Sequence, residues 1–194
     1  MLYKIYFVLL WPFVRLFYRI KIYGRENIPP EGPALICGNH SSLLDPVLVG
    51  LTMGIRRQMH FMVKKEIMAA PVLGLIVRST GAFSVDRDSG ISAIKNCFRL
   101  LNEKKMVMMF PEGTRNPEHR GQARSGAAMI ALRAGVTILP VYITPGKTHF
   151  FSHINVIVGK SYLPSPDKGL PKNEQYSSVA DDLMHRIYSL EGAC

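Results

Sequence analysis

A histidine and an aspartate stand five residues apart in the stretch NHSSLLD, residues 39–45. On one regular helix this spacing would leave the two side chains about 140° apart, so they would not face each other. If a strand ends before His40 and a helix begins near Asp45, the loop between them can return the carboxylate to the imidazole. A carboxylate on one ring nitrogen fixes the tautomer and leaves the other nitrogen available as a general base. The alternative is that Asp45 is only the N-cap of a helix with Pro46 at its first position, and that His40 is an incidental loop residue.

A second stretch that suits chemistry is FPEGTR, residues 110–115, which follows the hydrophobic run KMVMM. Gly113 permits a tight turn or a close backbone approach, and Thr114 can donate or accept a hydrogen bond. The planar guanidinium of Arg115 suits a phosphate group, and Glu112 can orient that arginine or bind a substrate hydroxyl. The alternative is a surface loop that holds a Glu112–Arg115 ion pair.

Two further arginines are candidate anion ligands. Arg87 ends the predicted strand GAFSVDR, and Arg124 precedes the predicted helix GAAMIALRAG. Free backbone N–H groups and the helix dipole favour an anion at such a helix start. Both arginines are also compatible with ordinary solvated surface charges.

Strands and helices alternate along the chain, and the candidate residues follow the strands. PALICGN forms a predicted strand before His40, and KMVMM forms another before Glu112. This alternation predicts a single α/β domain with a mostly parallel or mixed sheet flanked by helices. Since sites in such folds lie at the carboxyl ends of strands, we expect His40, Arg87 and the segment 112–115 to converge.

The composition limits the classes of partner and of chemistry. The 194 residues carry a net charge of +10, which favours nucleic acid, an anionic membrane or a phosphorylated substrate. Three widely spaced cysteines predict neither a disulfide framework nor a zinc site. Serine-hydrolase, dinucleotide-binding and P-loop motifs are absent from the sequence, as is a recognised nucleic-acid-binding module.

The first 20 residues combine aromatic side chains with flanking cations. Seven aromatic residues fall within the first 18 positions, but the uncharged stretch 5–14 is only ten residues long. A membrane-spanning helix needs about 20 residues, so the segment 1–20 is predicted to be an amphipathic helix in the membrane interface. Trp11, Phe13 and Phe17 are its predicted membrane contacts. The alternative is a terminal helix packed on the core of a domain formed by residues 21–194.

Four short motifs follow one another in an order that is typical of one protein family: NHSSLLD (39–45), GAFSVDR (81–87), FPEGTR (110–115) and ILPVYI (138–143). Together they resemble the motifs of the glycerolipid acyltransferases, and most closely those of the PlsC-type lysophosphatidic acid acyltransferases. The match covers about residues 33–145. Each motif is short, but their joint occurrence in this order is highly specific.

The resemblance implies a reaction and a set of site residues. His40 would be the general base, oriented by Asp45, for attack of the free hydroxyl of lysophosphatidic acid on an acyl thioester, which forms phosphatidic acid. The acyl donor would be acyl-CoA or acyl carrier protein, with no metal or other cofactor. The family's phosphate and glycerol site would comprise Arg87, Glu112, Gly113, Thr114, Arg115 and Arg124.

The expected partners are the two lipid substrates, an anionic membrane surface and, where it is the acyl donor, acyl carrier protein, and not nucleic acid. The expected location is peripheral or monotopic, on the cytoplasmic face of the cell membrane, with a role in phospholipid biosynthesis. Two alternatives stay open. The same machinery would also suit glycerol-3-phosphate or another lysolipid as acceptor, or the protein would be a catalytically silent lipid-binding membrane protein.

Overall fold

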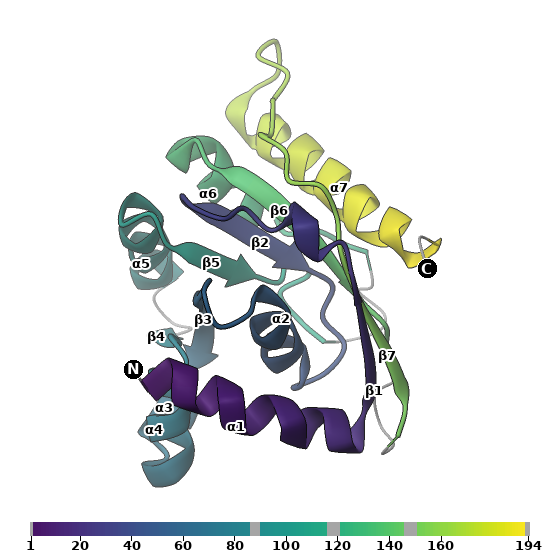
Figure 1. Ribbon diagram of the computed structural model, residues 1–194. Coiled ribbons are helices and arrows are strands. Elements are labelled where there is room, and N and C mark those ends of the chain that lie inside the picture. Colours follow the sequence, from purple (N-terminus) through teal and green to yellow (C-terminus); the bar gives the residue numbers. More distant parts are fainter. Residues whose placement is uncertain (1, 86–89, 116–120, 146–150, 193–194) are drawn as a thin grey trace.

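A mixed sheet of seven strands forms the centre of the computed structural model, which describes residues 2–85, 90–115, 121–145 and 151–192 (Figure 1). The strand order is β1-β7-β6-β2-β5-β3-β4, and every neighbouring pair is parallel except β6 with β7. The predicted fold class is therefore confirmed. The strands are β1 (Arg19–Tyr23), β2 (Ala34–Gly38), β3 (Met59–Lys64), β4 (Phe83–Val85), β5 (Met106–Met109), β6 (Thr137–Ile143) and β7 (His153–Val158).

Strand β2 is the central strand, and all five of its residues are buried. Its side chains alternate between the two faces of the sheet, as the pleat requires. Ile36 belongs to one hydrophobic cluster, whereas Leu35 and Cys37 belong to the other. Both clusters need apolar residues from β2, which is why this strand reads as an unbroken hydrophobic run.

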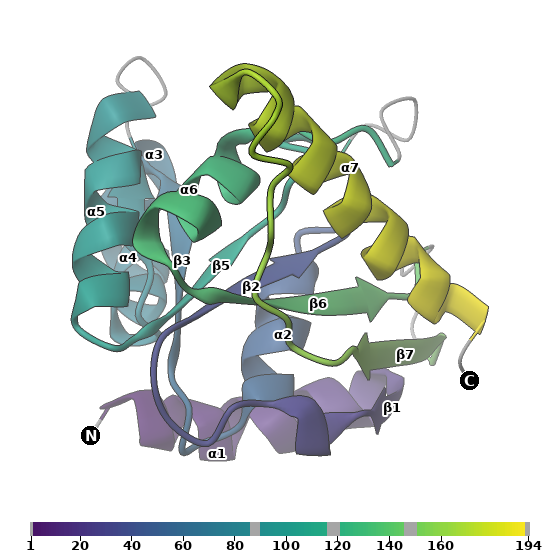
Figure 2. The same ribbon diagram turned by 90° about the horizontal axis from the view of Figure 1, so that it is seen from above.

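Helices cover both faces of the sheet (Figure 2). Helices α1 (Leu2–Phe17) and α2 (Asp45–Met53) pack on one face. Helices α5 (Gly90–Asn102), α6 (Gly126–Ala134) and α7 (Lys172–Ser189) pack on the other. Two shorter helices, α3 (Lys65–Ala69) and α4 (Pro71–Ser79), lie beside β4 and near the start of α1 (Figure 1). Single 3₁₀ turns occur at η1 (Arg25–Asn27) and η3 (Leu190–Gly192).

Helix α1 confirms the predicted N-terminal helix and has two apolar faces. Its inward face includes Phe7, Trp11 and the buried Val14, which pack against the core. Its outward face exposes aliphatic side chains that recur at helical spacing: Ile5, Val8, Leu9 and Leu16. Within the described ranges, no helix is both long enough and apolar enough to cross a membrane.

Candidate active site

The two central motifs meet at the carboxyl edge of the sheet. Strands β2 and β5 are parallel neighbours, so the segments that follow them leave the sheet at the same edge. His40 comes two residues after β2, and Glu112 comes three residues after β5. The backbone N–H of His40 donates a hydrogen bond to Oε2 of Glu112 at 2.8 Å. The predicted convergence of these two segments is confirmed.

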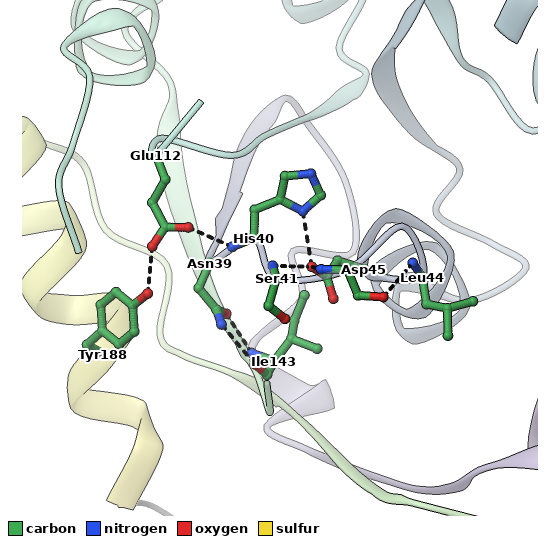
Figure 3. A network of polar contacts seen from close by, with 9 residues as sticks. Asn39, His40, Ser41, Leu44, Asp45, Glu112, Ile143 and Tyr188 are labelled. Atoms are coloured by element: carbon green, nitrogen blue, oxygen red, sulfur yellow. Dashed lines mark hydrogen bonds and ion pairs between the residues drawn. The ribbon is translucent and has the colours of Figure 1, made fainter. Parts of the chain in front are cut away.

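His40 and Asp45 form a hydrogen-bonded pair (Figure 3). Nδ1 of His40 lies 3.0 Å from Oδ2 of Asp45, and that oxygen also accepts the backbone N–H groups of Ser41 and Ser42, each at 2.7 Å. The Asp45 side chain is fully buried, and these donors offset the loss of water around its charge. The His40 side chain is 17% exposed. An Nδ1–H that donates to the carboxylate leaves Nε2 as the free basic nitrogen.

The position of Asp45 corrects one detail of the sequence interpretation. Helix α2 begins at Asp45, and Leu44 occupies the N-cap position. The carboxylate is turned back toward the preceding loop, where it accepts the backbone N–H groups of Ser41 and Ser42. The predicted N-cap role of Asp45 is therefore wrong by one residue, while its predicted reach to His40 is confirmed.

Two neighbours restrict the movement of His40. The ring of Phe110 stacks on the imidazole, with centroids 3.8 Å apart and planes inclined by 12°. The buried amide of Asn39 donates to the carbonyl of Ile143 and accepts its N–H, both at 2.8 Å. These two hydrogen bonds join the Asn39 side chain to the backbone of β6, just beyond the last backbone pairing of β2 with β6 at Gly38 and Val141. They fix the residue that precedes the histidine.

The FPEGTR segment and the start of α6 are in direct contact. Gly113 has a φ of 67°, and a Cβ there would lie 2.8 Å from Cδ of Arg124. The Arg124 N–H donates to the carbonyl of Pro111 at 2.8 Å, just before the N-cap Ser125 of α6. The left-handed backbone favours glycine at this position, and the missing side chain leaves room for the flexible Arg124 side chain. The arrangement holds Gly113 and Arg124 together, next to a helix N-terminus.

The remaining predicted site residues differ in what the structure says of them. Arg115 is exposed and Thr114 is partly exposed on the same loop. Glu112 is only 5% exposed and its carboxylate accepts internal hydrogen bonds, so the alternative of a surface Glu112–Arg115 ion pair is wrong. Arg87 lies outside the described residues, as does the side chain of Phe13.

An apolar cavity of about 60 Å³ lies between α1, α2 and β3. Its lining includes Phe7 of α1, Phe61 of β3, and Pro46, the neighbour of Asp45 in sequence. Such a lining suits a hydrocarbon chain better than a charged ligand.

The described cysteines do not resemble nucleophiles. Cys37 and Cys97 are both buried, and burial raises the pKa of Cys97 to about 11 and that of Cys37 further still. Because the thiolate is the reactive form, both are inert near neutral pH. Within the described residues there is also no cluster of three or more His, Cys, Asp or Glu that could hold a metal ion.

Sequence reasoning missed three residues of this site. Asn39 gave a signal, because it is a polar residue at the end of a buried strand. Phe110 gave none beyond its place in the FPEGTR motif. Tyr188 lies 76 residues from Glu112, to which its hydroxyl donates at 2.6 Å, and nothing in the local sequence announces that contact.

The fold and the site define an α/β protein in which a buried carboxylate is hydrogen-bonded to a histidine at the carboxyl edge of the sheet. A family model described as acyltransferase matches residues 19–144. The chain is 32% identical over 177 residues to a 1-acyl-sn-glycerol-3-phosphate acyltransferase of Bacillus subtilis, with 89% of this chain and 88% of that protein covered. It is also 32% identical over 181 residues to a chloroplastic protein of the same activity name from Arabidopsis thaliana, covering 86% of this chain and 50% of that protein.

The fold has a solved counterpart. The crystal structure of the 1-acyl-sn-glycerophosphate (LPA) acyltransferase PlsC from Thermotoga maritima matches with a TM-score of 0.70 and 24% identity, covering 98% of this chain and 78% of that one. The chain belongs to the acyltransferase family, and the resemblance carried by its four motifs is confirmed.

Proposed function

We propose that this protein transfers a fatty acyl group from acyl-CoA or acyl carrier protein to the free hydroxyl of lysophosphatidic acid, which yields phosphatidic acid. The observation that carries the proposal is the His40–Asp45 pair, with 3.0 Å between Nδ1 and Oδ2, beside the FPEGTR loop of an acyltransferase-family chain. The activity names of the relatives supply the acceptor.

In the proposed reaction, Nε2 of His40 accepts the proton of the acceptor hydroxyl as its oxygen attacks the thioester carbonyl carbon. The tetrahedral intermediate then collapses, the carbon–sulfur bond breaks, and the thiolate takes the proton from the imidazolium to leave as a thiol. Asp45 stabilises the imidazolium between these two steps. The reaction passes through no acyl-enzyme and needs no metal or other cofactor.

The phosphate of the acceptor is proposed to bind where the FPEGTR loop meets α6. Arg115 and Arg124 supply cationic donors there, and the helix start favours an anion. Gly113 and Thr114 belong to the same loop. Arg87, which lies outside the described residues, is a further proposed phosphate ligand.

The direct test is an acyl-transfer assay with a panel of acceptors. Purified protein in mixed micelles is given lysophosphatidic acid, glycerol-3-phosphate or lysophosphatidylcholine, each with palmitoyl-CoA and with palmitoyl-carrier protein. We expect thiol release and phosphatidic acid formation with lysophosphatidic acid, and at least tenfold lower kcat/KM with the other two acceptors. A preference for glycerol-3-phosphate or lysophosphatidylcholine would select the corresponding alternative. Vesicle binding without turnover of any acceptor would select the silent lipid-binding protein.

Peripheral attachment to the cytoplasmic face of the membrane is proposed to run through the outward face of α1. Leu9 and Leu16 are 66% and 67% exposed, and the cationic Lys4 and Arg15 lie exposed on the same helix. The predicted aromatic contacts Trp11 and Phe17 are partly buried, and Trp11 packs toward the core, so the aliphatic residues are better placed to enter a bilayer.

The double substitution Leu9→Asp/Leu16→Asp should weaken binding to vesicles that contain anionic phosphatidylglycerol. Each leucine side chain contributes about 1.5–3 kcal/mol on complete transfer out of water, so even partial insertion predicts a loss of roughly tenfold or more. Vesicle sedimentation measures it. Ile91→Asp is the matched control, because Ile91 is 69% exposed on α5, across the sheet from α1. An equal loss of vesicle binding in Leu9→Asp/Leu16→Asp and in Ile91→Asp, or no loss in either, would contradict attachment through α1.

A further inference from the structure

The carboxylate of Glu112 joins three separate segments of the chain. Its Oε2 accepts the backbone N–H of His40 at 2.8 Å. Its Oε1 accepts the N–H of Gly121 at 3.0 Å and the hydroxyl of Tyr188 at 2.6 Å. Figure 3 shows Glu112 between Tyr188 and the backbone of His40, with Asp45 on the other side of the histidine. A side chain with these contacts is built to hold the protein together at this point.

The consequence is that His40 is held at both ends. Asp45 fixes the ring through Nδ1, and Glu112 fixes the backbone through the amide. A carboxylate is planar and rigid, so donors that fix one of its oxygens also fix the direction of the other. The hydroxyl of Tyr188 therefore helps to set the direction in which Oε2 meets His40.

Packing places Tyr188 independently of this hydrogen bond. Helix α7 buries Leu183 and Ile187 against the sheet, and the ring of Tyr188 meets the ring of Tyr142 edge-on, with centroids 6.0 Å apart. Loss of the hydroxyl alone would leave that packing in place. The hydroxyl contact is thus an addition to a helix that is already docked.

We infer that Tyr188 is a positioning residue for the general-base step, acting on His40 through Glu112. This assigns a positioning role to a residue of helix α7, which lies beyond all four sequence motifs. It gives Glu112 a role inside the protein in place of the substrate contact expected from its motif. The inference rests on the proposed function for the reaction that it affects, but the hydrogen-bond relay itself does not.

The first test compares Tyr188→Phe with Tyr142→Phe. Tyr142 donates to Oε1 of Glu191, so the control removes a hydrogen bond of the same kind that does not involve Glu112. We expect Tyr188→Phe to lower kcat about tenfold, with both KM values within a factor of two and a Tm close to that of Tyr142→Phe. Wild-type kcat in Tyr188→Phe, or an equal fall of kcat in the control, would overturn the inference.

The second test asks whether the effect passes through Glu112. Tyr188→Phe is introduced into a Glu112→Gln background, and kcat is measured across the double-mutant cycle. A tyrosine that acts through Glu112 should have little further effect once that carboxylate is gone, whereas independent residues would give additive losses. Additivity would overturn the inference.

A third measurement needs no turnover. Hydrogen exchange at the His40 amide, followed by NMR in detergent micelles, should be faster in Tyr188→Phe than in wild type or Tyr142→Phe. If the wild-type protein transfers no acyl group to any acceptor, the proposed function fails and this measurement alone decides the inference. Unchanged exchange in Tyr188→Phe would then overturn it.

Discussion

Replacement of His40 by alanine is expected to lower kcat by about 10²-fold to 10⁴-fold, the usual contribution of a positioned general base. In the proposed reaction the imidazole provides the basic nitrogen that accepts the hydroxyl proton, and the buried thiols Cys37 and Cys97 are poor substitutes. Both KM values should change little, because the ring acts on the reacting proton and not on the phosphate. Thiol release under saturating lysophosphatidic acid and palmitoyl-CoA measures the effect.

The fold should survive this substitution. Asp45 keeps the N–H groups of Ser41 and Ser42 as donors when the imidazole is removed, and Asn39 keeps its paired bonds to Ile143. His153→Ala is the matched control, since His153 is an exposed histidine at the start of β7. Full activity in His40→Ala, or a comparable loss in His153→Ala, would contradict the assignment of the base.

The arrangement of the sheet could be predicted because its central strands are continuous apolar runs. Leu35 to Cys37 of β2 and Met106 to Met108 of β5 have to be buried on both faces, and parallel strands leave the sheet at one edge. The meeting of His40 with Glu112 follows from that topology. The pairing of His40 with Asp45 does not follow from the topology, because a loop of four residues can equally well leave the two side chains apart.

The orientation of α1 could not be predicted from periodicity. Both faces of this helix are apolar, so the pattern lacks the contrast between polar and apolar sides that usually identifies the buried face. The sequence predicted the aromatic residues of this helix as its membrane contacts. In the structure Trp11 packs inward, while Leu9 and Leu16 are left outside.

Tyr188 could not be predicted for a different reason. The position of a tyrosine beside Ile187 on an amphipathic helix predicts only a packing role, and its ring does pack against Tyr142. The contact with Glu112 depends on how α7 crosses the sheet relative to β5. That crossing is a tertiary property, set by the burial of Leu183 and Ile187 among residues far away in sequence.

Asp45→Asn is expected to lower kcat by about 10²-fold to 10⁴-fold while retaining the helix that begins at this residue. In the wild-type protein Nδ1 of His40 lies 3.0 Å from the carboxylate, and an Nδ1–H that donates to it leaves Nε2 as the proposed base. An amide that keeps its oxygen on the N–H groups of Ser41 and Ser42 could still accept a hydrogen bond from Nδ1, but it lacks the negative charge that stabilises an imidazolium. If the NH₂ group instead faces the ring, it favours the tautomer that protonates Nε2 and removes the base.

A loss of stability should accompany the loss of activity, because Asp45 is fully buried and its donors need an acceptor. One poorly satisfied buried group costs about 1–3 kcal/mol, which chemical denaturation would measure. Glu174→Gln is the matched control, since Glu174 is an exposed acid in the first turn of α7; it should leave kcat unchanged and cost no more than about 0.3–1 kcal/mol of stability through the helix dipole. A destabilised Asp45→Asn protein with wild-type kcat would show that the carboxylate only shapes the loop. A large fall in kcat at a temperature where the variant is fully folded would show that it acts on the histidine.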